Sequence, residues 1–278
     1  MLKALKDIVK EASNKSKNYQ DVSLKDITYL IKETFSLDEI SYILNENTLY
    51  EEDLIKEKLD LLFLGMPVEY VLGYRYFLGN KFKVTNDTLI PRNETEELVI
   101  YTKELIKKEN MLNPSIVEVG TGSGCICISL SLEYPSSKVD SVDLSSKALE
   151  VARINNGALN GHVNFYNGDT LTPVINNKYD VLTSNPPYID KDTYVQESVL
   201  KYEPHMALFA DNHGLDIYEK IFKNVDRVMN KHAILTFEIS PDLEKGLTLL
   251  INKYLPSFEY EFKKDINGLI RFLFLIRR

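Results

Sequence analysis

The chain has 278 residues, which is enough for one large domain or two ordinary ones. Hydrophobic residues make up 44% and charged residues 27%, a composition typical of a globular protein with a substantial core. The net charge of −8 argues against a protein that binds the phosphate backbone of duplex DNA, because such binding depends on an excess of Lys and Arg.

No apolar run reaches the roughly 20 residues of a membrane-spanning helix, and residues 1–17 lack the apolar block of a signal peptide. We therefore expect a cytoplasmic protein with no membrane partner. Cys125 and Cys127 are one residue apart and lack the second half of a zinc site, so we expect small buried residues at a helix start. The four histidines also lack ligand spacing, and no metal is predicted.

The first 67 residues are expected to form a bundle of short helices, because apolar residues recur there at helical spacing. Ser23 can cap the second helix, and Ser36 is expected to begin a capping box for the third. A further amphipathic stretch ends at Gly65, a glycine typical of a helix end. The apolar positions of the first three helices are Leu2, Leu5, Ile8, Val9 and Ala12, then Ile27, Leu30 and Ile31, then Ile40, Ile43 and Leu44.

Residues 68–91 carry many β-forming side chains, interrupted by Gly73 and by Gly79-Asn80. This pattern predicts a β-hairpin that links the helical part to a second domain at residues 92–278. The β-formers are Tyr70, Val71, Leu72, Tyr74, Tyr76, Phe77, Phe82 and Val84.

Strands and helices alternate from Ser115 onward, which predicts an α/β fold. We expect a doubly wound, mostly parallel, seven-stranded Rossmann-like sheet with helices on both faces. The expected strands are 116–119, 139–143, 163–165, 179–183, 233–238, 258–262 and 269–276. The expected helices run to about residue 132 after the first strand and to about 159 after the second, with others after Gly214 and Pro241.

A glycine-rich turn follows the first of these strands, with Gly120, Gly122 and Gly124 separated by Thr121 and Ser123. Glycines between a strand and a helix let a ligand approach the backbone closely. Taken alone, the turn is compatible with a dinucleotide site, a methyl-donor site or a purely structural role.

Acidic residues follow the next two strands. Asp143 ends the second strand, where a carboxylate can accept hydrogen bonds from both ribose hydroxyls of a nucleoside, or can simply cap the next helix. Asp169 follows the third strand and can accept the exocyclic amino hydrogen of an adenine, or can be an ordinary turn residue. Neither residue decides which nucleoside cofactor is bound.

The segment Asn185-Pro186-Pro187-Tyr188 after the fourth strand indicates the chemistry. Two consecutive prolines fix the backbone and remove two N–H donors. The Asn185 side-chain oxygen and the Pro186 carbonyl can each accept one hydrogen of a planar NH₂ group, on which Tyr188 can stack. Its nitrogen then faces an activated methyl group, so that positioning supplies most of the rate. The pattern predicts an S-adenosylmethionine-dependent N-methyltransferase.

On these residues the sequence resembles the HemK family, the bacterial peptide chain release factor glutamine methyltransferases. The resemblance covers nearly the whole chain, and Ile90-Pro91-Arg92 with the N-terminal helices distinguishes this branch from enzymes that methylate DNA adenine. Asn93 and Thr170 depart from the family pattern, which often has Pro and an aromatic residue there. The matching segments are 67–73, 77–79, 82–84, 89–96, 120–124 and 185–189, then 203–204, 207–208, 214–215, 264–265, 268 and 271.

The resemblance implies that the acceptor is the glutamine side chain in the Gly-Gly-Gln motif of class 1 release factors. It assigns catalysis to Asn185, Pro186 and Tyr188, and glutamine binding to these residues with Pro187. The helical part and the hairpin would help to grip the release factor. For the cofactor it implies Gly120, Thr121, Gly122, Ser123, Gly124, Asp143 and Asn185, to which the residue pattern adds Asp169 and Thr170.

Several alternatives remain open at this point. A glutamine methyltransferase of a ribosomal protein shares the catalytic segment. An adenine-N6 DNA methyltransferase would need a basic groove and a target-recognition region, and neither is apparent. A non-catalytic nucleoside-binding module and an NAD-dependent dehydrogenase fit the sequence less well. Arg92 and Glu94 could close over the site or form a structural salt link. We expect a monomer that binds no nucleic acid stably.

Overall fold

The chain folds into two compact units in a computed structural model that describes residues 1–19 and 22–278. The first unit contains Met1–Arg75 together with Val195–Tyr202. The second contains Tyr76–Tyr194 together with Glu203–Arg278. Within the described ranges, no helix is both long and apolar enough to cross a bilayer.

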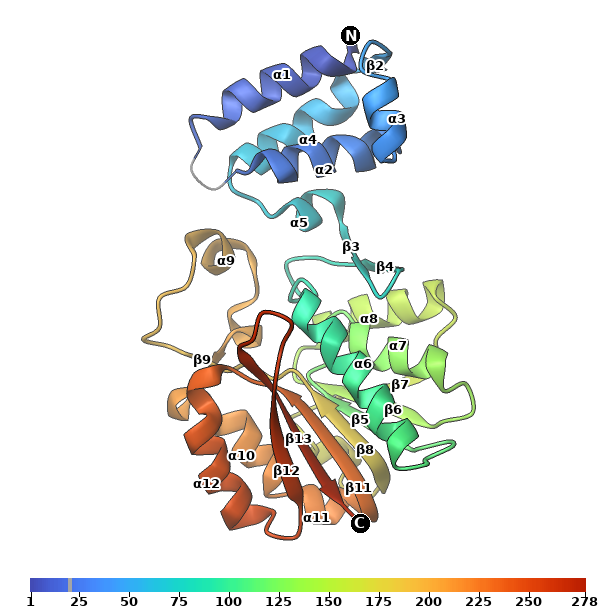
Figure 1. Ribbon diagram of the computed structural model, residues 1–278, viewed down its shortest axis with the longest axis vertical. Coiled ribbons are helices and arrows are strands. Elements are labelled where there is room, and N and C mark those ends of the chain that lie inside the picture. The colour runs from blue at the N-terminus through green and yellow to red at the C-terminus, as the bar shows by residue number, and fades with distance from the viewer. Residues whose placement is uncertain (20–21) are drawn as a thin grey trace. The chain divides into compact units, whose positions relative to one another are not determined.

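The first unit is helical and has its own core (Figure 1). Helices α1, α2 and α4 bury Leu5, Leu30, Ile31 and Ile55 at 0–1% exposure. The inserted helix α9 belongs to this unit, where the Tyr202 hydroxyl donates to the Leu64 carbonyl at 2.9 Å. Its elements are β1 (Leu2–Ala4), α1 (Leu5–Ser16), α2 (Leu24–Phe35), α3 (Glu39–Leu44), β2 (Leu49–Glu51), α4 (Asp53–Phe63), α5 (Val68–Leu72) and α9 (Glu197–Tyr202).

The caps of these helices confirm two expectations and correct one. Ser23 forms a capping box with Asp26 at the start of α2, and Gly65 follows α4 with a φ of +86°. The capping box expected at Ser36 is wrong. Ser36 instead ends α2 in the left-handed conformation (φ 55°), and the Asp38 side chain caps α3 by accepting from the Ser41 N–H at 2.6 Å.

The prediction of a β-hairpin over residues 68–91 is also wrong for residues 68–72. Residues 68–72 form α5, which starts after Pro67 and ends at Gly73 (φ 80°), whose N–H donates to the Glu69 carbonyl. Val68 is buried in the helical core, and Val71 and Leu72 pack against it, so burial overrides their β propensity. The hairpin itself is shorter and consists of β3 (Tyr74–Phe77) and β4 (Asn80–Lys83).

The second unit is built on a seven-stranded sheet in the order β12-β13-β11-β8-β5-β6-β7, which confirms the predicted fold class. Strands β5 to β8 and β11 pair in parallel, whereas β13 is antiparallel to both of its neighbours. The chain order reverses direction at β5 and β8, the arrangement that opens a ligand crevice at the carboxyl edge. The strands are β5 (Ile116–Val119), β6 (Val139–Asp143), β7 (Val163–Asn167), β8 (Tyr179–Ser184), β11 (Met229–Glu238), β12 (Glu259–Lys264) and β13 (Ile270–Arg277).

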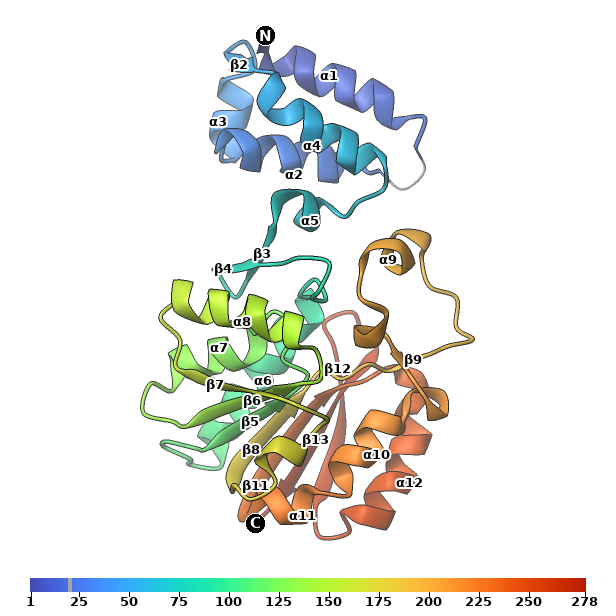
Figure 2. The same ribbon diagram turned by 180° about the vertical axis from the view of Figure 1, so that it is seen from behind.

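Helices cover both faces of this sheet (Figures 1 and 2). The face under α6, α7 and α8 holds Cys125 and Cys127, which are buried as expected, and burial raises the pKa of both thiols. The other face holds a second apolar cluster that includes Tyr218 and Phe237. The helices are α6 (Asn93–Lys108), α7 (Cys125–Glu133), α8 (Ser146–Ala158), α10 (Asp216–Phe222), α11 (Val225–Val228) and α12 (Glu244–Tyr254), with short strands β9 (Ile189–Asp190) and β10 (Phe209–Ala210) outside the main sheet.

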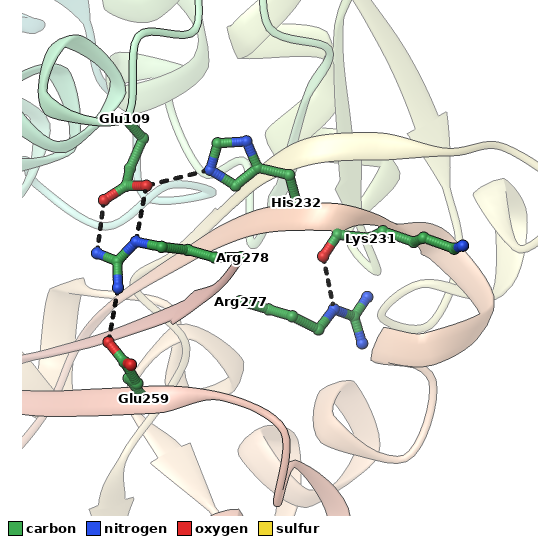
Figure 3. A network of polar contacts seen from close by, with 6 residues as sticks. All are labelled: Glu109, Lys231, His232, Glu259, Arg277 and Arg278. Atoms are coloured by element: carbon green, nitrogen blue, oxygen red, sulfur yellow. Dashed lines mark hydrogen bonds and ion pairs between the residues drawn. The ribbon is translucent and has the colours of Figure 1, made fainter.

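A polar network ties the end of β13 to α6 and β11 (Figure 3). The Arg278 guanidinium donates two hydrogen bonds of 2.8 and 3.1 Å to the Glu109 carboxylate and one of 2.7 Å to Glu259. His232 lies 3.1 Å from the same Glu109 carboxyl, and Arg277 donates to two backbone carbonyls of β11. Bonding to Arg278 lowers the pKa of Glu109 and keeps it ionised.

Candidate active site

A cavity of about 310 Å³ opens at the carboxyl edge of the parallel strands, and its lining residues all belong to the second unit. This volume lies within the range of small-molecule sites. Parallel strands bring the segments after β5, β6, β7 and β8 to one edge, which is why residues spread over the sequence meet here. The sequence-predicted residues that line the cavity are Gly120, Thr121, Gly122, Ser123, Asp143, Asp169, Thr170, Asn185 and Pro187; Gly124, Pro186 and Tyr188 do not line it.

The glycine loop after β5 needs its glycines for two different reasons. Gly120 and Gly122 have φ values of +88° and +54°, which L side chains rarely adopt, and a Cβ on Gly120 would lie 3.6 Å from the Asn185 carbonyl. A Cβ on Gly124 would meet Ile128 Cδ1 at 2.7 Å. Gly124 has a φ of +83° as well, so it is required both by its backbone conformation and by the packing of α7, whereas Gly120 and Gly122 lie in the cavity wall.

Asp143 joins this loop to the start of α8. One carboxyl oxygen accepts from the Gly122 N–H and the other from the Ser145 N–H, each at 2.8 Å. Burial raises the pKa of Asp143, and these backbone bonds oppose the rise. A carboxylate oxygen has two lone pairs, so both oxygens can still accept from the hydroxyls of a ligand.

Asp169 and Thr170 form another part of the wall. The Asp169 side chain is exposed, while Thr170 is buried at 8% exposure. Thr170 has a φ of +46°, a conformation that is costly for a β-branched residue. Gly168 precedes them and donates its N–H to the Asp143 carbonyl at 3.0 Å. The segment is therefore held to the end of β6.

Asn185 is part of a hydrogen-bond chain, with a buried centre at Thr95 and Glu238, that the sequence did not reveal. Its side-chain nitrogen donates to Thr95 Oγ1 at 3.1 Å, and the Thr95 hydroxyl donates to Glu238 Oε2 at 2.7 Å. The Tyr188 hydroxyl donates to the other oxygen of Glu238 at 3.4 Å. Glu238 ends β11, which is parallel to β8 and beside it, so the strand order would have placed this carboxyl near Asn185.

Glu118 is a second carboxyl that sequence reasoning left out of the site, although it lies only two residues before Gly120. It lines the cavity, is fully buried, and accepts from the Ser141 hydroxyl at 2.7 Å through Oε2. Among the residues that the structure describes, its Oε1 has no hydrogen-bond partner of ordinary geometry. Burial raises the pKa of Glu118 to about 8, opposed by the nearby Cys127 and Ser141. Such an unsatisfied buried acceptor fits a cationic ligand group.

Arg92 was expected either to close over the site or to form a structural ion pair, and in the structure it forms an ion pair with Glu203. Its guanidinium donates to Glu203 Oε1 at 2.5 Å, and the Ile90 N–H donates to Glu203 Oε2 at 3.3 Å. Glu203 is buried, and its neighbour Pro204 and the Pro91 between Ile90 and Arg92 both line the cavity. The ion pair therefore fastens two segments of the cavity wall to each other.

A Rossmann-like sheet with this cavity between a glycine loop and an Asn-Pro-Pro-Tyr segment defines an S-adenosylmethionine-dependent methyltransferase. Residues 100–203 match the family model of the methyltransferase small domain. Within this class, the chain belongs to the release factor glutamine methyltransferases. It is 40% identical to that enzyme of Staphylococcus aureus over 76% of each chain, and 38% identical to that of Enterococcus faecalis over 87% of this chain and 88% of the relative.

The fold is also shared with more distant methyltransferases. The solved hMettl16 catalytic domain in complex with MAT2A 3′UTR hairpin 1 superposes with a TM-score of 0.59 and covers 91% of both chains at 14% identity. The predicted family, fold class and enzyme class are thus confirmed, while the individual roles of the site residues stay predictions.

Proposed function

We propose that this enzyme methylates the side-chain amide nitrogen of the glutamine in the Gly-Gly-Gln motif of class 1 release factors. The observation that carries the proposal is the hydrogen bonding of the Asn185 side-chain amide. Its nitrogen is engaged by Thr95, so its oxygen is left as an acceptor at a cavity that Asn185 lines. A primary amide of glutamine needs an acceptor of this kind.

The residues of the cavity fit S-adenosylmethionine. Asp143 offers acceptors for ribose hydroxyls, and the free Glu118 oxygen suits the ammonium of the methionine part. Asp169 and Thr170 would form the adenine side, with Gly120 to Gly124 against the remainder. When bound, the cofactor supplies a methyl group already activated by a sulfonium.

The chain's own residues then act by positioning. Asn185 Oδ1 and the Pro186 carbonyl would each accept one N–H of the glutamine amide, which orients the nitrogen lone pair. Burial raises the pKa of Tyr188 and keeps the phenol neutral, and its bond to Glu238 holds the ring. A neutral, fixed ring offers a face on which the planar amide can stack.

We further propose that residues 1–67 and the hairpin region contribute to binding the release factor, and that the enzyme works as a monomer in the cytoplasm. Three exposed apolar side chains on α3, Ile40, Ile43 and Leu44 at 69–76% exposure, support a protein-binding role for the helical unit. The net charge of −8 favours a protein acceptor over bulk nucleic acid.

Transfer of a labelled methyl group tests the proposal. Purified enzyme is incubated with release factor, with the same factor carrying Gln→Ala in its Gly-Gly-Gln motif, and with whole ribosomes. We expect label only on the unaltered factor, mapped to that glutamine by mass spectrometry. Label on a ribosomal protein instead would support the alternative acceptor, and equal labelling of the Gln→Ala factor would refute the assignment.

A further inference from the structure

The orientation of the Asn185 amide is determined by how many hydrogens its neighbours have. A threonine hydroxyl has one hydrogen, and an ionised carboxylate can only accept. The Thr95 hydrogen points to Glu238 Oε2 at 2.7 Å, so toward Asn185 the same oxygen can only accept. While Glu238 is ionised, Asn185 must therefore turn its NH₂ toward Thr95, and its oxygen is left for the acceptor.

We propose that Thr95 and Glu238 are positioning residues, which hold the Asn185 amide with its oxygen toward the methyl acceptor. This inference rests on the proposed function, because only an amide or amino acceptor needs that oxygen. If the amide were turned over, two N–H groups would face the two N–H groups of the glutamine. Productive binding would then be lost.

Burial makes the arrangement well defined. Thr95 and Glu238 are 3% and 2% exposed, so a hydrogen-bonding group left without its partner there costs free energy. They reach Asn185 from different elements, Thr95 from the first turn of α6 and Glu238 from the end of β11. The Tyr188 hydroxyl occupies the other Glu238 oxygen at 3.4 Å, so the same carboxyl orients two residues of the catalytic segment.

The ionisation of Glu238 therefore matters for turnover. Burial raises its pKa to about 7, and Thr95 and Arg271 oppose the rise. Once protonated, Glu238 can donate to Thr95, whose own hydrogen is then free to bind the Asn185 oxygen. We expect turnover to fall as the pH drops through about 7. The titratable groups that face Glu238 are Arg271, Glu94, Tyr188, Tyr218 and Cys125.

Three threonine variants test the inference by kinetics on the release factor. Thr95→Val keeps the side-chain shape but removes the hydroxyl, and Thr95→Ser restores it. Thr102→Val is a matched control, because Thr102 lies on the same helix, is equally buried and bonds to Leu98 and Thr236 away from the cavity.

We expect Thr95→Val to lower kcat by 10- to 100-fold, with the Kd for S-adenosylhomocysteine within threefold of the unaltered enzyme. Thr95→Ser should recover kcat to within about fivefold, and Thr102→Val should stay within twofold on both measures. Glu238→Gln should remove the fall in kcat near pH 7, since it does not ionise. An unreduced kcat in Thr95→Val, an equal loss in Thr95→Ser, or an unchanged acidic limb in Glu238→Gln would overturn the inference.

Neutron diffraction from the unaltered, deuterium-exchanged chain decides the same point without an acceptor or a variant. We expect deuterium between Thr95 and Glu238, and the two amide deuterons on the Asn185 atom nearest Thr95. Deuterium on Thr95 directed at the Asn185 oxygen would refute the inference even if turnover behaved as expected. If the unaltered enzyme labels no release factor, the proposed function fails, and the diffraction result still stands by itself.

Discussion

Glu118→Gln changes one atom in a buried side chain, so its effect can be worked out from the structure. Glu118 is fully buried, and burial raises its pKa from 4.5 to about 8. Ionising it in the folded protein therefore costs on the order of 5 kcal/mol, since ~1.4 kcal/mol corresponds to each pH unit. Glutamine keeps the volume and an oxygen that can accept from the Ser141 hydroxyl, but it never ionises.

The sign follows from proton binding. Between pH 4.5 and about 8 the folded chain keeps the Glu118 proton that the unfolded chain has lost. Stability from this residue is therefore complete below pH 4.5 and disappears as the pH rises through about 8. Burial also raises the pKa of Glu238, so its contribution to stability falls with pH in the same direction. Glu238 is present both in the unaltered protein and in Glu118→Gln, so this contribution cancels when their stabilities are compared.

We expect the stability advantage of Glu118→Gln to grow by roughly 2–4 kcal/mol between pH 5 and pH 8.5, allowing for water that enters through the cavity. Urea unfolding at the two pH values, followed by hydrogen exchange of the β5 and β6 peptides, measures the second unit alone. The same variant should bind S-adenosylhomocysteine about tenfold more weakly, because it cannot form the charge-assisted contact that we propose between Glu118 and the ammonium of the ligand. A pH-independent difference in stability would refute the assignment of a raised pKa to Glu118.

Two further predictions concern stability. Ser23→Ala removes the capping box of α2 and should cost about 1 kcal/mol, seen as faster hydrogen exchange in the first turn of that helix, whereas Ser23→Asp should restore protection. Unchanged exchange in Ser23→Ala would contradict the cap. Glu109→Gln removes the ion pair with Arg278 and should lower Tm. We expect the free energy of unfolding to fall by about 1 kcal/mol, and by less in 1 M salt. A loss that did not depend on salt would point to packing instead.

Much of the fold could be predicted because the second unit follows regular patterns. Buried parallel strands are mainly apolar, as Ile116–Val119 is apart from Glu118, and the glycine loop marks the turn into α7. The carboxyl edge of such a sheet collects ligands, so Asp143 and Asn185 could be assigned to a site before their distances were known.

Other features depend on tertiary packing that a linear pattern does not encode. Residues 68–72 have β-forming side chains, yet they pack as a helix against the first unit's core. Asp38 caps α3 in place of Ser36, because the Asp38 side chain lies where it can accept from the Ser41 N–H. Thr95 and Glu238 are 143 residues apart, and only the strand order brings them to Asn185.

The division of the chain also has a consequence for the order of events during synthesis. The first unit includes Val195–Tyr202, which leaves the ribosome about 120 residues after Arg75. At translation rates of roughly 5–20 residues per second, this delay is on the order of 6–24 s. During that time the helices near Leu64 have emerged without the Tyr202 hydroxyl that later binds the Leu64 carbonyl. The part of the protein that is made first is therefore completed only after much of the catalytic sheet has been translated.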